Sequence, residues 1–262
     1  MLSRACLCIL GLVVALTSGQ AMAASAGHLH IGVSFSIPPY VIQEQDRGIE
    51  IDLLRATLQT PEYDLHIHYL PLARSFQMLE SGELDGMINV RPGMVDASRI
   101  QEVYYSQPVI TFRNQLITLS SRWPEGSLTR MAQLSTLKLL AFQRATQILG
   151  QEFATAVAQS PYYAETAKQP LQVRQLLRGR IDGAVMEARV FNYYLRQAQN
   201  SGQFLDHELA QPVAHHPLFP PTRYHFAFRD AAVRDHFNQR LGALQRNGGY
   251  HKILARYGAS DE

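Results

Sequence analysis

The chain carries the segment LESGELDGMIN at residues 79–89 and a related segment, LLRGRIDGAVM, at residues 176–186. In each segment a helical stretch ends at a glycine, an Asp-Gly turn follows, and a short apolar strand begins. Asp85 and Asp182 hold equivalent positions roughly 100 residues apart, far longer than the period of about 20 to 50 residues in solenoid repeats. The repeated pattern therefore predicts two similar α/β lobes, with both Asp-Gly pairs acting as turns.

The residues around the first segment alternate between strand and helix patterns. We expect a strand from residue 30, a rigid turn at Ile37-Pro38-Pro39-Tyr40, a helix at 49–58, a strand at 64–70, a helix at 73–80 and a strand at 86–90. Strands and helices that alternate in this way form βαβ units around a mostly parallel sheet.

Polar residues stand where the two related strands end. The first strand ends at Asn89-Val90-Arg91 and the second at Met186-Glu187. In open α/β sheets, ligands bind beyond the carboxyl ends of the strands. We therefore expect a cleft between the lobes with an arginine on one wall and a glutamate on the other.

The first 23 residues have the pattern of a secretory signal peptide. Arg4 precedes an apolar run of about a dozen residues, too short for a membrane span of about 20, and a small-x-small motif ends at Ala23. Cys6 and Cys8 lie inside this segment, so the mature chain is expected to be free of cysteine. This predicts a periplasmic protein that needs no disulfide.

Composition narrows the classes of partner and chemistry. The net charge is +2, with 46% hydrophobic and 18% charged residues, which argues against a nucleic-acid partner. The chain has no G-x-S-x-G elbow, HExxH helix or GK[ST] loop, so nothing supports catalysis directly. We expect no cofactor.

Two histidine patterns were weighed as metal ligands. His66 and His68 share one face of a strand, but no third ligand is near in sequence, so no metal site is predicted. His215 and His216 lie in the proline-rich stretch 212–221, which predicts a loop.

Taken together, the residues resemble the family 3 solute-binding proteins, the periplasmic receptors of polar amino-acid ABC transporters. The match spans nearly the whole mature chain, and the order and spacing of its pieces make it specific. The matching pieces are Ile31-Gly32 with Pro39-Tyr40, then residues 48–54, 79–88, 98–108, 179–182 and 247–253.

The resemblance implies a periplasmic-binding-protein type II fold, in which two crossing strands join the lobes. Lobe one would comprise residues 28–111 and 223–262, and lobe two residues 115–218. The crossings would fall near 111–115 and 218–223. The tail would return to lobe one as a strand at 224–228 and a helix with one apolar face, formed by Val233, Phe237, Leu241 and Leu244.

The resemblance also implies which residues bind the ligand. Arg99 matches the arginine that pairs with the ligand carboxylate. Glu187 matches the aspartate that accepts from the ligand amine. Thr146 and the backbone amides near it match a stretch that opens a helix and can hold an anion. The remaining candidate ligand-binding residues are Tyr40, Asn89, Arg91 and Arg144.

Some positions depart from the family pattern and leave the ligand open. Ile37 stands where an aromatic residue commonly stacks on the ligand, Ala145 replaces a usual glycine, and Met94 and Asp96 replace small hydroxyl residues. Asp96 would favour a cationic ligand, whereas Arg74, Arg91 and Arg144 would favour an acidic one.

The function that follows is capture of a small polar solute, with an amino acid as the expected class, by hinge closure for an inner-membrane ABC permease. We expect a monomer that is not an enzyme. Two alternatives stay open. One is an enzyme on the same fold, similar to the cyclohexadienyl dehydratases, and the other is a ligand-sensing adaptor for a membrane receptor.

Overall fold

The computed structural model describes residues 27–34, 36–95, 100 and 102–259. The predicted signal peptide lies outside this part of the chain. Within it, no helix is both long enough and apolar enough to cross a membrane.

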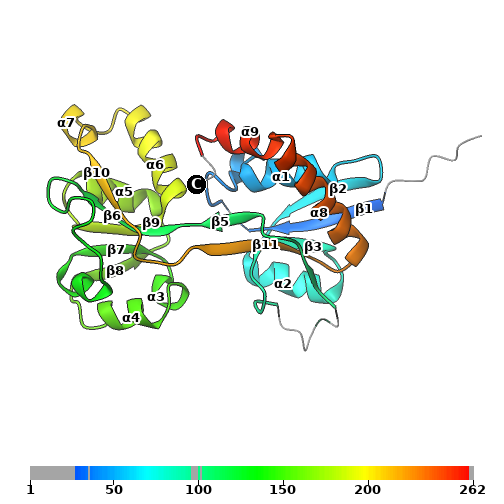
Figure 1. The fold of residues 1–262 in the computed structure, drawn as a ribbon, viewed down its shortest axis with the longest axis horizontal. Coiled ribbons are helices and arrows are strands. Elements are labelled where there is room, and N and C mark those ends of the chain that lie inside the picture. Colours follow the sequence, from blue (N-terminus) through cyan, green and yellow to red (C-terminus); the bar gives the residue numbers. More distant parts are fainter. Residues whose placement is uncertain (1–26, 35, 96–99, 101, 260–262) are drawn as a thin grey trace, which may run out of the picture.

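The described chain forms two lobes, each built on one β-sheet (Figure 1). In lobe one, β1 pairs in parallel with β2 and β3, and β11 runs antiparallel to β3, β4 and β5. The strand order is β2 (Tyr63–Tyr69), β1 (Gly27–Val33), β3 (Gly86–Val90), β11 (Thr222–Phe228) and β4 (Tyr104–Tyr105), and β5 (Ile110–Phe112) pairs with β11.

Lobe two repeats the arrangement with a five-stranded sheet. Here β7 lies parallel to β8 and β9, and β6 runs antiparallel to β9 and β10. The order is β10 (Val213–His216), β6 (Asn114–Leu119), β9 (Gly183–Glu187), β7 (Leu139–Phe142) and β8 (Tyr163–Thr166). Two mixed sheets flanked by helices confirm the predicted α/β fold.

Helices cover both sheets. Lobe one carries α1 (Ile49–Leu58), α2 (Leu72–Ser81), α8 (Ala231–Arg246), α9 (Gly249–Arg256) and the short 3-10 helix η1 (Gln43–Gln45). Lobe two carries α3 (Ala145–Ile148), α4 (Gln151–Val157), α5 (Gln169–Leu177), α6 (Ala188–Asn200), α7 (Asp206–Leu209) and the 3-10 helix η2 (Met131–Thr136). As the apolar pattern of the tail predicts, α8 buries Val233, Phe237 and Leu241.

The two Asp-Gly pairs perform the same structural task in each lobe. The Asp85 carboxylate accepts a hydrogen bond of 2.8 Å from the His30 amide of β1, and the Asp182 carboxylate accepts one of 2.9 Å from the Lys138 amide, next to β7. Each aspartate also donates its own amide to the carbonyl of the same partner residue. The turn therefore fixes the start of one parallel strand against its neighbour, and the aspartate side chains are structural.

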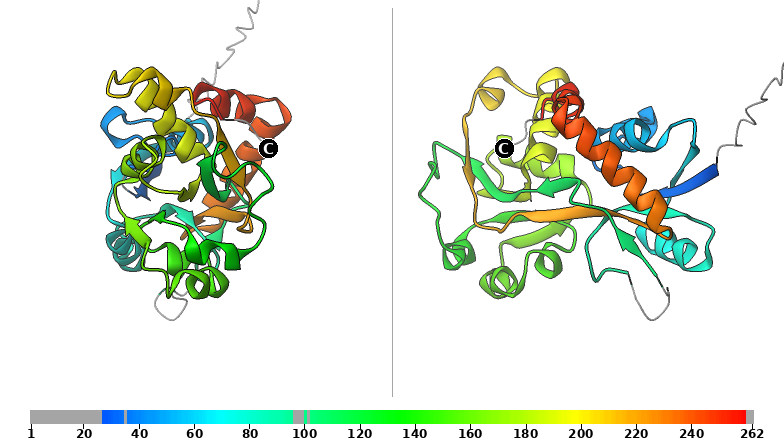
Figure 2. Two further views of the ribbon diagram at one scale, coloured as in Figure 1. Left: turned by 90° about the vertical axis from the view of Figure 1, so that its left-hand side faces the viewer. Right: turned by 45° about the vertical axis from the view of Figure 1, so that its right-hand side comes forward.

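The chain passes between the lobes twice within the described part. It leaves β5 at Phe112 and enters β6 at Asn114, and it returns from β10 to β11 between His216 and Thr222. Figures 1 and 2 show the crossing strands β5 and β11 running beside each other between the lobes. The lobe boundaries given from sequence stay a prediction.

Local predictions were correct to within a few residues, with one clear error. The predicted helix at 73–80 is α2 (Leu72–Ser81), and the predicted strand at 86–90 is β3. The proline-rich stretch 212–221 was expected to be a loop, yet it contains β10, because Val213–His216 pairs along the edge of β6 and the prolines stand outside those four residues.

Glu50, in the first turn of α1, is the most deeply buried carboxyl group described. Its side chain is 0% exposed, and neither oxygen has a hydrogen-bond partner. Burial raises its pKa from the ordinary 4.5 to about 8. Glu50 is therefore protonated in the folded protein at neutral pH, whereas it is ionised in the unfolded chain.

We predict that Glu50→Gln abolishes a loss of stability that the wild type shows as pH rises from 4.5 to about 8. Between pH 4.5 and about 8 the folded state keeps a proton that the unfolded state releases. The free energy of unfolding should therefore fall as pH rises, by about 1.4 kcal/mol per pH unit from this group. Urea denaturation at pH 5 and pH 8.5 measures this, with Glu152→Gln on exposed α4 as the control. Parallel pH dependence in the wild type and Glu50→Gln would contradict the assignment.

Candidate functional site

A cavity of about 410 Å³ lies between the lobes. Both lobes and both crossings contribute to its walls. The shape of the cavity therefore depends on the orientation of the lobes relative to each other. The lining residues of lobe one are Ser34, Ile37, Leu72, Asn89, Arg91 and Met94. Those of lobe two are Phe142, Arg144, Gln147, Ile148, Gln169, Glu187 and Val190. Phe112, Asn114 and Tyr224 come from the crossing strands.

The cavity stands at the carboxyl ends of the related strands, as the sequence predicts. Asn89 and Arg91 come from the end of β3, and Glu187 ends β9. Asn89 has a φ of 63°, a left-handed conformation that asparagine tolerates better than most residues. The site residues Asn89, Arg91, Arg144 and Glu187 are thus brought together around one cavity.

Glu187 occupies the junction between the cavity and the first crossing. Its carboxylate accepts hydrogen bonds from the Val190 amide at 3.0 Å, where it caps α6, and from the Arg113 amide at 3.3 Å in the crossing. The residue is 5% exposed. Burial raises its pKa above the ordinary 4.5, although these two hydrogen bonds and the Arg189 charge act in the opposite direction. A cationic group in the cavity would relieve this cost.

Tyr40 lies behind the wall of the cavity. Its side chain is 0% exposed, its ring stacks on Phe112 at 4.5 Å between centroids, and it is not among the residues that line the cavity. Burial raises the pKa of Tyr40 well above 10, and the charge of Glu187 adds to the effect. Tyr40 therefore supports Glu187 and the crossing strand rather than contacting the space where a ligand would lie.

Arg91 is the described cation on the lobe-one wall. Its guanidinium carbon lies 6.0 Å from the centroid of the Tyr224 ring, a cation–π arrangement. The buried Nε atom has no hydrogen-bond partner among the described residues. A buried donor without a partner is costly. Arg91 lines the cavity, so its guanidinium can pair with a ligand carboxylate there.

The backbone amides near Thr146 already hold an anion from the protein itself. The carboxylate of Glu165 on β8 accepts from the Arg144 amide at 2.6 Å, the Thr146 amide at 3.0 Å and the Thr146 hydroxyl at 3.0 Å. It also accepts from the Tyr163 hydroxyl at 2.8 Å. Burial acts to raise the pKa of Glu165, but these hydrogen bonds outweigh it and lower the pKa below 4.5.

Glu165 therefore occupies the place that the resemblance assigned to a ligand anion, and Thr146 is not among the residues that line the cavity. Arg144 does line it, and its side chain donates to Gln147 at 2.8 Å. No sequence signal pointed to Glu165, because it lies in a strand about 20 residues further along the chain, outside every matched piece.

The remaining predicted residues divide into three groups. Arg99 and Asp96 lie outside the described residues. Ile37 and Met94, which depart from the family pattern, do line the cavity, so these departures bear on the ligand. Arg74 is exposed on α2 and is not a lining residue.

Three lining residues were not predicted, although their places in the crossing strands could have indicated them. They are Phe112, Asn114 and Tyr224.

The fold and the cavity define a two-lobed solute-binding protein of the periplasmic-binding-protein type II class. The chain belongs to the bacterial extracellular solute-binding proteins, family 3, which it matches over residues 29–260. A ligand-binding role follows from this membership. Among curated proteins, none matches the chain significantly.

Solved structures with the same fold come from several functional settings. A histidine kinase sensor domain with similarity to periplasmic binding proteins has a TM-score of 0.64 at 18% identity, covering 91% of this chain and 99% of that one. The GluR0 ligand-binding core in complex with L-glutamate has a TM-score of 0.66 at 18% sequence identity, and the match covers 89% of this chain and 99% of that one. Substrate-binding domain 2 of Lactococcus lactis GlnP, in an open conformation, has a TM-score of 0.62 at 22% sequence identity, and the match covers 91% of this chain and 98% of that one. At these identities the likeness shows the fold.

We predict that Glu165→Ala destabilises the protein by about 1 to 2 kcal/mol, because two amides and two hydroxyl groups lose their acceptor. Urea denaturation at pH 7 measures the loss, with Glu152→Ala on exposed α4 as the matched control. The loss should shrink in acid, since a carboxylate with a lowered pKa stabilises at neutral pH and ceases to do so once protonated. Equal effects of the two substitutions would refute this role of Glu165.

Proposed function

We propose that this protein captures an amino acid in the cavity between its lobes and delivers it to an inner-membrane ABC permease. The observation that carries the proposal is the pairing of opposite charges across the cavity, with Arg91 on the wall of lobe one and Glu187 on the wall of lobe two. An amino acid presents a carboxylate and an ammonium group, so it can pair with both.

Each charged wall residue is better satisfied with a ligand present. The guanidinium of Arg91 gains a carboxylate partner, and the raised pKa of Glu187 falls when an ammonium group approaches. Both contacts form together only when the lobes are close enough for one small molecule to reach both walls. Ligand binding therefore favours a closed arrangement, reached by rotation about the crossing strands.

The charges of the described lining favour an acidic or neutral amino acid over a basic one. Arg91 and Arg144 are both lining residues, against one carboxylate, Glu187, whose two oxygens already accept backbone hydrogen bonds. The predicted partner of the ligand carboxylate, Arg99, would add a third positive charge, and Asp96 would offset it.

The second candidate function is ligand sensing, in which the ligand-bound protein acts on a membrane receptor instead of a permease. The likeness to a histidine kinase sensor domain supports it at the level of fold.

Catalysis has less support than binding or sensing. An acid–base pair of Glu187 with a histidine would be needed, and no histidine is among the described lining residues.

A thermal-shift screen of amino acids, small peptides and organic acids tests the proposal. A ligand at 100 times its dissociation constant adds about 2.7 kcal/mol to stability, which shifts the melting temperature measurably. We expect amino acids with acidic or neutral side chains to give the largest shifts. Shifts confined to molecules without an amino group, or chemical conversion of the ligand during incubation, would contradict the proposal.

We predict that Arg91→Ala and Arg99→Ala each weaken binding of the amino acid that the screen identifies, by about 2 to 5 kcal/mol, the range for breaking a buried charged pair. Arg74→Ala, on the exposed face of α2, is the matched control and should leave affinity unchanged. Isothermal titration calorimetry measures all three. Unchanged affinity in both Arg91→Ala and Arg99→Ala would refute pairing of the ligand carboxylate with lobe one.

A further inference from the structure

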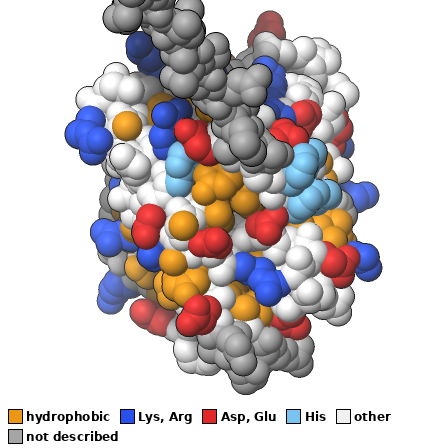
Figure 3. All heavy atoms as spheres, turned by 90° about the vertical axis from the view of Figure 1, so that its right-hand side faces the viewer, with side chains coloured by type: hydrophobic (Ala, Val, Ile, Leu, Met, Phe, Trp, Pro, Cys, Tyr) orange, Lys and Arg blue, Asp and Glu red, His pale blue; other side chains and the backbone are white. Residues whose placement is uncertain are grey.

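Five polar side chains gather at the end of lobe one that lies away from lobe two. In the parallel pairing of β1 with β2, His28 lies opposite Asp64 and His30 lies opposite His66. Residues two apart on a strand share a face, so His28, His30, Asp64, His66 and His68 all lie on one face of these two strands. Histidine side chains are visible on this end of the molecule in Figure 3.

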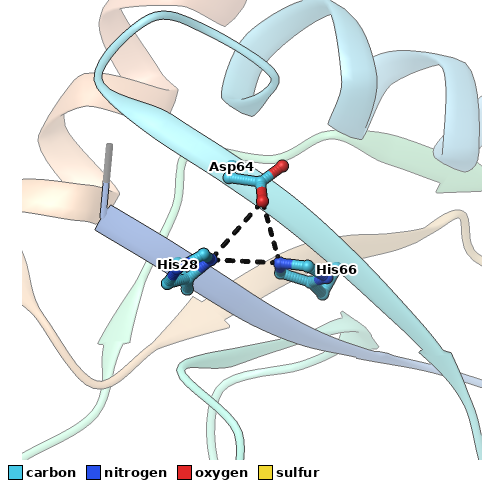
Figure 4. A group of neighbouring side chains, drawn as sticks. All are labelled: His28, Asp64 and His66. Carbon is cyan, nitrogen blue, oxygen red and sulfur yellow. Dashed lines mark hydrogen bonds and ion pairs between the residues drawn. The ribbon is translucent and has the colours of Figure 1, made fainter. Parts of the chain in front are cut away.

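Three of these side chains point toward one another, as Figure 4 shows. The Nδ1 atom of His28 lies 3.2 Å from Nε2 of His66 and 3.4 Å from Oδ2 of Asp64, and the latter two atoms are 3.1 Å apart. Zinc bound tetrahedrally has ligand bonds of about 2.0 to 2.2 Å, which separates neighbouring ligand atoms by about 3.3 to 3.6 Å. The observed triangle is close to one face of such a tetrahedron.

Hydrogen bonds alone satisfy this triangle poorly. Each imidazole nitrogen carries either one hydrogen or one lone pair, and the carboxylate oxygen only accepts. If both nitrogens donate to Asp64, the two N–H groups converge on the same region. If one nitrogen donates to the other, the donor has used its single hydrogen and the acceptor carries none, so neither is left to donate to Asp64. A cation at the centre of the triangle would be bound by lone pairs from all three atoms.

The surroundings hold the three ligand atoms in place and leave access for an ion. The second oxygen of Asp64 faces the Gln59 amide at 3.5 Å, and the His30 ring stacks on the His66 ring at 5.0 Å between centroids. His30 in turn contacts His68 at 2.9 Å between ring nitrogens. The side chains of the triangle are 42% to 67% exposed, so a fourth coordination position faces solvent.

We propose that His28, Asp64 and His66 form a binding site for a divalent transition-metal ion of the zinc type. Two imidazoles and one carboxylate suit borderline ions such as Zn²⁺ and Cu²⁺, whereas Ca²⁺ and Mg²⁺ prefer oxygen ligands. The site joins β1 to β2, which is the edge strand of its sheet, and shares no residue with the cavity between the lobes. The proposal is therefore independent of the function proposed above.

The sequence indicated only half of this arrangement. It singled out His66 and His68, whose positions on one strand are about 7 Å apart along the chain, and found no third ligand. His28 lies almost 40 residues earlier in the chain. The strand register places it opposite Asp64 and therefore diagonally across from His66, which brings the three side chains together.

Isothermal titration calorimetry with ZnCl₂ tests the site, using protein that lacks the predicted signal peptide and any polyhistidine tag. We expect one zinc ion per chain, bound at least about tenfold more weakly by His28→Ala and by His66→Ala. His207→Ala, which removes an exposed histidine of lobe two, should bind zinc like the wild type. CaCl₂ should give no saturable binding.

A stability measurement separates loss of the site from loss of the fold. Without metal, the melting temperature of His66→Ala should equal that of the wild type within a few degrees. Zinc should raise the melting temperatures of the wild type and of His207→Ala, but not that of His66→Ala. The proposal is overturned if wild-type protein gives no saturable zinc binding, or if His28→Ala and His66→Ala bind zinc as tightly as His207→Ala does.

Discussion

The carboxylate of Glu187 ties the binding cavity to the joint between the lobes. It accepts from the Arg113 amide in the first crossing and from the Val190 amide at the start of α6. Two further hydrogen bonds reinforce this tie, from the Ala188 amide to the Arg113 carbonyl and from the Arg189 guanidinium to the Thr111 carbonyl. Because one carboxylate both faces the cavity and holds the crossing, a charge brought into the cavity acts directly on the segment that joins the lobes.

Three carboxyl groups in this protein, two of them buried and one partly buried, have different hydrogen-bond partners, and the partners decide what each group does. Glu50 has no partner and keeps its proton, so it contributes to stability only where it is neutral. Glu165 has four hydrogen-bond donors and stays ionised, which fixes the loop before α3. Glu187 lies between these extremes, with two backbone donors and a raised pKa. Of the three, Glu187 is the carboxyl group that lines the cavity, so a cationic ligand group there would lower its pKa.

Much of the fold could be predicted from sequence because it depends on local signals. The related segments at 79–89 and 176–186 predicted two similar lobes, and the ends of β3 and β9 correctly indicated Asn89, Arg91 and Glu187 as neighbours of the cavity. What could not be predicted depends on contacts between distant strands. The occupation of the Thr146 amides by Glu165, the edge pairing of β10 and the triangle of His28 with Asp64 and His66 all follow from sheet register, which single residues do not encode.

We propose that one ligand draws the two lobes together. Cysteines introduced at Gln77 on α2 and Glu152 on α4 would stand on opposite lobes (Figure 1), and labels would attach only there in protein made without Cys6 and Cys8. Fluorescence energy transfer between the labels, titrated with the amino acid that binds most tightly, measures closure directly. We predict transfer that rises and saturates at the calorimetric dissociation constant. Tight binding with unchanged transfer would show that the lobes do not close on the ligand.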